Sequence, residues 1–276
     1  MPSLAGLKHR VLSLFGRSYT QAAERLMQQF PVFVPSSENY YRYPELTYSA
    51  ANDFPHLLAD FSRLMGHLPL PAPVSPSEFA GHTDHTSLRD LFERYGSDKG
   101  RHDYYHVYGH ILSAGRCEKK RTLEIGLGTN NPALVSTMGA SGSPGASLRA
   151  LRDYLPEAEI YGADIDPEIL FEETRIKTFV VDQLDPSSFD ELAAQFGSAE
   201  FDLVIDDGLH SPSANINTLS FGIRSVRVGG WVVIEDIAER SLPAWEAINA
   251  VLDHSKHEVH LIKAINAYMF LVKRVA

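Results

Sequence analysis

Short apolar runs recur along the second half of the chain, and longer mixed segments separate them. Strands are expected at 121–125, 159–163, 177–181, 201–205 and 231–234. The spacing of apolar residues between 145 and 154 predicts a helix. Strands that alternate with helices build βαβ units, so the pattern predicts an α/β fold with a mostly parallel sheet.

The end of the chain breaks this alternation. Two apolar segments, 257–262 and 267–273, are separated only by a short turn at Asn266. A turn of this length joins antiparallel strands, whereas a parallel pair needs a long crossover. The last strand is therefore expected to lie antiparallel in an otherwise parallel sheet.

The first 80 residues follow a different pattern. Helical spacing is found in 4–15 and 20–30, and an aromatic, proline-bearing segment covers 31–43. The proline-rich run 68–73 is stiff and extended, which is typical of a linker. We therefore expect an N-terminal extension at 1–80 and a second domain at 81–276. The extension either covers the domain or a partner subunit, or forms an aromatic lid over a substrate.

Composition narrows the class of protein. The 276 residues carry a formal net charge of −10, which argues against non-specific nucleic-acid binding. One cysteine excludes an internal disulfide and a cysteine-based metal site. No apolar run approaches the roughly 20 residues that cross a bilayer, and the apolar stretch near the N-terminus is short for a signal peptide. We expect a cytoplasmic protein with no membrane partner.

Two acidic clusters follow apolar runs that read as buried strands. Asp206-Asp207-Gly208-Leu209-His210 comes after 201–205, and Glu235-Asp236 comes after 230–234. The carboxyl ends of strands are where an α/β sheet binds ligands. Hard oxygen donors beside one histidine predict a divalent cation, Mg²⁺ before Mn²⁺ or Ca²⁺, next to a general base.

The sides on which these carboxylates lie can be argued from strand geometry. Neighbouring strands are about 4.8 Å apart, so Asp207 and Glu235-Asp236 can converge on one point. Adjacent side chains point to opposite faces, which assigns Asp206 to the turn or the cofactor pocket. Two plainer interpretations stay open: Glu235 and Asp236 as caps of a helix at 237–240, and His210 as an ordinary loop histidine.

A glycine-rich turn follows the first strand of the second domain. Gly126 and Gly128 allow close approach of the backbone to a ligand, but Asn131 stands where the dinucleotide fingerprint requires a third glycine. A pyrophosphate cradle is therefore disfavoured. Asp164 ends the next strand, where a carboxylate binds ribose hydroxyls. Asp182-Gln183 ends the third, within reach of an adenine.

Three motifs together resemble class I S-adenosylmethionine-dependent methyltransferases, which have a Rossmann-like fold. They are Leu123-Glu124-Ile125-Gly126-Leu127-Gly128, Tyr161-Gly162-Ala163-Asp164 and Val204-Ile205-Asp206-Asp207-Gly208. Within this class, Asp98-Lys99-Gly100 with His102, Tyr104 and Tyr108, the segment 145–149, and 207–210 are similar to a narrower family. It is the metal-dependent sugar O-methyltransferases of macrolide tailoring, of mycinamicin and tylosin type.

The resemblance implies roles for individual residues. Glu124, Gly126 and Gly128 would line the methionine and ribose part of S-adenosylmethionine, Asp164 would bind the ribose, and Asp182 and Gln183 would flank the adenine. Lys99, Tyr108 and Asp206 would also contact the cofactor. Asp207, Glu235 and Asp236 would hold Mg²⁺, with Asp207 and His210 as catalytic residues and His210 as the base. The segment 129–144 departs from the simplest motif and is expected to form a loop beside the active site.

The chain is thus expected to be an O-methyltransferase that acts on a hydroxyl of a sugar-containing or polyhydroxylated small molecule. Chelation of neighbouring hydroxyls would stabilise the developing alkoxide. A catechol-type phenol would suit the same metal and stays an alternative. A nicotinamide-dependent oxidoreductase is a further one, against which Asn131 and the second acidic cluster count, and an intact metal-and-base set counts against a non-catalytic binding module. The acceptor and the oligomeric state stay open, a homo-oligomer included.

Overall fold

The computed structural model describes the backbone of residues 43–276. The chain forms two compact units, Met1–His67 and Leu68–Ala276. The helices expected at 4–15 and 20–30, and all but the last residue of the aromatic segment at 31–43, lie outside the described residues.

The described part of the first unit is one long helix, α3, which spans Tyr43–Leu64. This helix was not predicted from the sequence. Phe54, Leu57, Leu58 and Phe61 are nevertheless spaced three or four residues apart, as on one face of an amphipathic helix. Pro55 lies inside the helix and masks the signal, because proline normally ends one.

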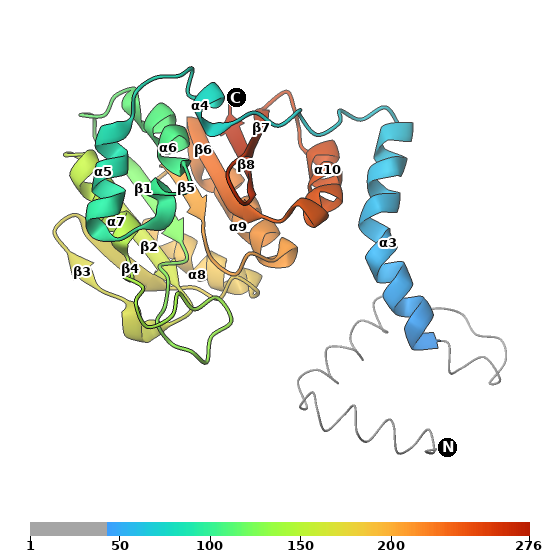
Figure 1. Cartoon of the computed structure of the whole chain (residues 1–276), viewed down its shortest axis with the longest axis horizontal. Coiled ribbons are helices and arrows are strands. Elements are labelled where there is room, and N and C mark those ends of the chain that lie inside the picture. Colours follow the sequence, from blue (N-terminus) through green and yellow to red (C-terminus); the bar gives the residue numbers. More distant parts are fainter. Residues whose placement is uncertain (1–42) are drawn as a thin grey trace, which may run out of the picture. The chain divides into compact units, whose positions relative to one another are not determined.

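An eight-stranded sheet forms the centre of the second unit (Figure 1). The strands are β1 (Arg121–Ile125), β2 (Glu159–Asp164), β3 (Glu172–Glu173), β4 (Ile176–Val180), β5 (Phe201–Asp206), β6 (Val226–Ile237), β7 (His257–Lys263) and β8 (Tyr268–Arg274). Their order in the sheet is β3-β4-β2-β1-β5-β6-β8-β7. The pairs from β4 to β6 are parallel, whereas β3, β8 and β7 pair antiparallel. The predicted sheet with its antiparallel last strand is confirmed.

Helices cover both faces of the sheet (Figure 1). Those of the second unit are α4 (Pro76–Phe79), α5 (Thr86–Tyr95), α6 (Tyr104–Ser113), α7 (Ala146–Tyr154), α8 (Pro186–Phe196), α9 (Pro212–Ser225) and α10 (Leu242–Val251). Leu88 of α5, Tyr108 of α6 and Leu148 of α7 belong to one layer of the core. Phe189 of α8, Phe221 of α9 and Trp245 of α10 belong to the other. The result is the three-layer arrangement of α/β proteins.

The segment before α4 is part of the second unit. Val74 N–H donates to the Leu261 carbonyl over 3.1 Å, and Lys263 N–H donates to the Val74 carbonyl over 2.8 Å. The Asn249 side chain holds the carbonyls of Leu68 and Pro69. Because these bonds tie the proline-rich run to β7 and α10, this run belongs to the compact unit Leu68–Ala276, whereas the domain boundary expected near residue 80 stays a prediction.

Among residues 43–276, no helix has the combined length and apolarity that crossing a bilayer requires.

Phe270 tests the core layer between α10 and the sheet. It is fully buried on β8, with its ring centroid 4.8 Å from that of Trp245. Phe270→Ala should lower the free energy of unfolding by about 3–5 kcal/mol, because the cavity adds to the lost transfer free energy. Val251→Ala, at a residue 78% exposed on α10, should change it by less than about 0.5 kcal/mol. Urea denaturation followed by circular dichroism measures both, and equal effects would contradict this packing.

Candidate active site

The register of the parallel strands brings three strand ends level. Ile125 of β1 pairs with Asp206 of β5, and Asp206 pairs in turn with Ile234 of β6. Asp207 N–H then donates to the Ile125 carbonyl over 2.8 Å, which fixes the chain as it leaves β5. The side chains that follow each strand therefore meet at one edge of the sheet.

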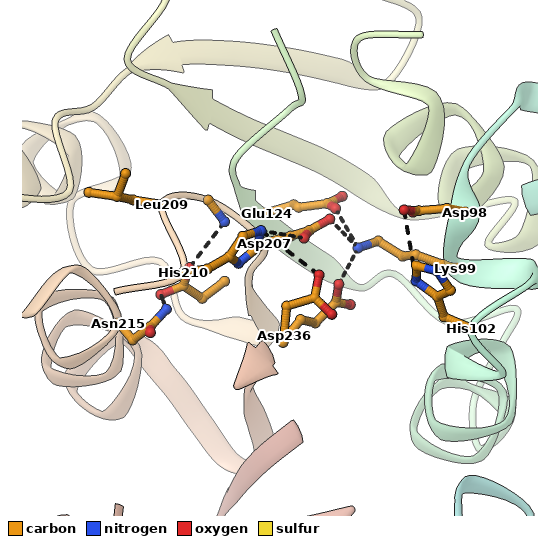
Figure 2. A network of polar contacts seen from close by, with 12 residues as sticks. Asp98, Lys99, His102, Glu124, Asp207, Leu209, His210, Asn215 and Asp236 are labelled. Carbon is orange, nitrogen blue, oxygen red and sulfur yellow. Dashed lines mark hydrogen bonds and ion pairs between the residues drawn. The ribbon is translucent and has the colours of Figure 1, made fainter. Parts of the chain in front are cut away.

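A buried lysine joins three of the carboxylates at this edge (Figure 2). The Lys99 Nζ lies 2.6 Å from Asp207 Oδ2, 2.6 Å from Glu235 Oε2 and 3.2 Å from Glu124 Oε1. Lys99 itself is 1% exposed. Burial alone would lower the pKa of Lys99, but the three carboxylates together raise it well above its ordinary value. The side chain is therefore a fixed positive charge.

Glu235 and Asp236 are adjacent, but their side chains have different partners. Both Glu235 oxygens are occupied, Oε2 by Lys99 and Oε1 by the Tyr108 hydroxyl. Asp236 accepts a hydrogen bond from Tyr104 and lines the cavity described below. The pairing of β6 with β8 shifts register between Ile234 and Ile237, which marks a bulge. Bulges of this kind re-aim side chains next to active sites.

Asp207, His210 and Asp236 form the group that fits a metal ion among the described residues. One ligand atom of each lies within 4.8 Å of the others. His210 Nε2 is 3.9 Å from Asp207 Oδ1 and 3.8 Å from Asp236 Oδ2 (Figure 2). The predicted ligand set held Glu235 in place of His210. The structure brings together His210 and the two aspartates, and directs Glu235 to Lys99.

Two members of this group have an unusual backbone. His210 has φ +52° and Asp236 has φ +55°, in the left-handed region that residues other than glycine rarely adopt. Such residues cost of order 1–3 kcal/mol and cluster at functional sites. The conformations are held by the surrounding contacts, because neither residue gains from them in isolation.

Asp206 supports the loop from beneath. It is fully buried and accepts hydrogen bonds from the side chains of Gln183, over 2.9 Å, and Asn215, over 3.2 Å. Burial raises the pKa of Asp206, and these two donors oppose the rise. As expected from strand alternation, its side chain points away from the Asp207 side. Asn215 was not predicted, since an asparagine in the first turn of a helix gives no signal of such a contact in the sequence.

Gln183 ties the same loop to the end of β4. Its Nε2 also donates to Thr218 Oγ1 over 2.9 Å, and its Oε1 accepts the Leu209 N–H over 2.7 Å. A Cβ on Gly208 would lie 2.0 Å from Gln183 Oε1, so a larger residue there would displace the Gln183 side chain. The amide that was predicted to flank an adenine is thus engaged in holding the chain before His210. Its contact with a cofactor stays a prediction.

A cavity of about 450 Å³ opens beside these residues. Of the residues predicted to bind the cofactor, the cavity is lined by Gly126, Gly128, Asp164, Asp182 and Gln183. Glu124, Lys99, Tyr108 and Asp206 are not among its lining residues and are buried behind it. The Asp164 carboxylate already accepts the N–H groups of Leu127 and Asp166, which orients it at the cavity wall.

The glycine turn packs against its neighbours without side chains between them. Gly126 has φ +95°, and a Cβ there would lie 2.1 Å from the Asp207 carbonyl oxygen. A Cβ on Gly128 would overlap the Met138 thioether of the 129–144 segment. This segment is closed at its base, where Met138 N–H donates to the Thr129 carbonyl over 2.8 Å. Its residues Leu134 to Met138 line the cavity, so the segment does lie beside the site.

The fold and the strand-end site define a class: the chain has the Rossmann-like fold of class I S-adenosylmethionine-dependent methyltransferases. The mycinamicin-pathway methyltransferase MycE, solved with Mg, SAH and mycinamycin VI, is similar at a TM-score of 0.55 and 28% identity, over 68% of this chain and 54% of that chain. MycE with Mg and SAH alone gives a TM-score of 0.53 and 27% identity, over 68% of this chain and 55% of that one. No protein-family model matches the chain.

Curated relatives are named as sugar O-methyltransferases. The 8-demethyl-8-alpha-L-rhamnosyl tetracenomycin-C 2'-O-methyltransferase of Streptomyces olivaceus is 32% identical over 71% of this chain and 50% of its own length. The mycinamicin VI 2''-O-methyltransferase of Micromonospora griseorubida is 38% identical over 54% of this chain and 36% of its own length. The chain resembles this group and spans half or less of the length of these two relatives.

Gln183→Met tests the support of the His210 loop. Methionine keeps the length of the side chain but leaves the Leu209 N–H without its acceptor and Asp206 without one donor. The free energy of unfolding should fall by about 1–3 kcal/mol, and amide hydrogen exchange across 206–211 should accelerate. Asp182→Asn is the control, because that carboxylate accepts only the exposed Leu184 N–H in this region. Unchanged amide hydrogen exchange across 206–211 in Gln183→Met would refute the role of Gln183 in supporting the His210 loop.

Proposed function

We propose that the chain is a metal-dependent O-methyltransferase that transfers a methyl group from S-adenosylmethionine to a hydroxyl of a sugar-containing small molecule. The observation that carries the proposal is the group Asp207, His210 and Asp236, which faces the cavity beside the glycine turn. The named activities of the relatives support the same chemistry. A cytoplasmic location, a homo-oligomer and the absence of a nucleic-acid partner stay predictions.

The cavity walls fit a nucleoside cofactor. S-adenosylmethionine, when bound, supplies a methyl group on a positively charged sulfur. Gly126 and Gly128 let the backbone approach it closely, since no side chain intervenes. Asp164 keeps acceptor capacity beyond its two backbone bonds, and we assign it to the ribose hydroxyls. Asp182 lines the same cavity, and we assign it to the adenine.

The donor set fits a hard divalent cation. Mg²⁺, when bound, would polarise the acceptor hydroxyl and favour its ionised form. Asp207 and Asp236 would hold it, because their carboxylate oxygens face one another across His210 and are the ligand type that Mg²⁺ prefers. Glu235 can join them only by giving up one of its bonds to Lys99 and Tyr108. The four carboxylates outnumber the single lysine, so the site attracts a cation.

His210 is the group placed to take the proton of the acceptor hydroxyl. Its Nε2 points between the two aspartates and is within reach of a hydroxyl bound there. Tyr104 holds Asp236 in place, and burial with the nearby Glu235 and Asp236 raises the pKa of Tyr104. Tyr104 therefore remains a neutral hydrogen-bond donor and does not compete for the proton.

Metal binding gives the first test of this function. Asp207→Asn should weaken Mn²⁺ binding by at least about tenfold, because it removes one anionic ligand, while the affinity for S-adenosylhomocysteine stays within a few-fold. Mn²⁺ is followed by electron paramagnetic resonance and the nucleoside by calorimetry. Methyl transfer to a panel of glycosides, detected by mass spectrometry, should stop in EDTA. Turnover that persists in EDTA, or tight binding of NAD instead, would rule out the proposal.

His210→Gln separates a proton acceptor from a metal ligand. Loss of a general base should lower kcat by about 10²–10⁴-fold. Mn²⁺ affinity should change by only a few-fold, since Asp207 and Asp236 are intact. The matched control is His102→Gln, at a half-buried histidine on the other side of Lys99. A large loss of Mn²⁺ affinity in His210→Gln would make His210 a ligand and require another base.

A further inference from the structure

The Lys99 ammonium lies at a position whose surrounding oxygens could also bind a metal cation. Carboxylates from the ends of β1, β5 and β6 supply one oxygen each, at 3.2, 2.6 and 2.6 Å from Nζ. Protein oxygens bind Ca²⁺ at 2.3–2.6 Å and Mg²⁺ at 2.0–2.1 Å, so small shifts would bring these three onto an ion. Glu124 and Glu235 are 1% exposed and Asp207 is partly buried, so the three carboxylates repel one another and a cation among them offsets this repulsion.

Glu124 provides independent support for this interpretation. It is 1% exposed, and its Oε2 accepts the Ser147 hydroxyl over 2.6 Å. Its Oε1 is buried and has no hydrogen-bond partner, although Lys99 Nζ lies 3.2 Å away. The ammonium thus balances the charge of Glu124 without satisfying this oxygen by a hydrogen bond. A buried acceptor aimed at the position of Nζ retains capacity for a cation.

Asp207 connects this position to the proposed metal site. Its Oδ2 contacts Lys99, whereas its Oδ1 faces His210 and Asp236 (Figure 2). One carboxylate therefore lies between two cation positions, in the way that bridging carboxylates serve two-metal sites. One of the two positions is filled by a group of the chain itself.

We infer that Lys99 is a tethered cation that permanently fills the second cation position of a two-cation site, so that one exchangeable divalent ion completes the site. The inference rests on the proposed function only for the ion between Asp207 and Asp236. Lys99 acts through Asp207 and Glu235 as a positioning residue. Its removal should uncover a binding site for a second divalent ion.

The test counts Mn²⁺ ions per chain by electron paramagnetic resonance and calorimetry, using the full chain. The wild type should bind one, and Lys99→Ala should bind two, because the truncated side chain leaves room and three carboxylates. Lys99→Met, which fills the space with an apolar group, should not gain the second ion. Lys120→Ala is the matched control: Lys120 is 5% exposed, pairs with Asp202 at 3.9 Å and lies at the opposite end of β1. It should bind one.

The outcomes separate this inference from the proposed function. One ion in both the wild type and Lys99→Ala would overturn the tethered cation and leave the function standing. No ion in the wild type but one in Lys99→Ala would refute the metal-dependent function and support the tethered cation. If Lys99→Ala does not fold without metal, Mn²⁺ or methylammonium should restore its circular dichroism spectrum. Failure of both to do so would also overturn the inference.

Discussion

The ion cluster around Lys99 is the interaction on which the strand-end site depends. Lys99 offsets part of the negative charge of three carboxylates at the ends of β1, β5 and β6, and without it these side chains would repel one another more strongly. Its consequence is directional. Because one oxygen of Asp207 is held by the ammonium, the other is turned to His210. The arrangement of the cavity wall therefore follows from a charge that the cavity itself does not expose.

Much of the fold could be predicted from the sequence, because it depends on local patterns. Arg121–Ile125 coincides with β1, and the other predicted strands overlap those observed to within a few residues, apart from β6, which begins earlier than predicted. The edge strand β3 was missed because two residues carry no periodicity. Helix α3 was missed because Pro55 lies inside it, and a proline normally ends a helix.

The site was predictable in position but not in detail. Strand ends and acidic clusters located Asp207, His210 and Asp236 correctly at one edge of the sheet. The partners of Glu235 were not predictable, because they come from Lys99 and Tyr108, more than a hundred residues earlier. The strand alternation that separated Asp206 from Asp207 also gave no guidance at Glu235-Asp236, since a bulge interrupts β6 there. Gln183 shows the same limit: its position fits a cofactor contact, but its hydrogen bonds go to the loop.

Gly126 gives the geometry a property that no side chain could provide. A Cβ there would lie 2.1 Å from the Asp207 carbonyl oxygen, so the turn that would receive the methyl donor and the loop that would activate the acceptor pack together through main chain. Covalent backbone geometry varies little, whereas side chains change rotamer within nanoseconds. The spacing between this turn and this loop therefore depends less on side-chain rotamers than a contact between side chains would. In an in-line transfer, where an error of about 1 Å is costly, such a main-chain contact would help to keep the methyl donor and the acceptor in place.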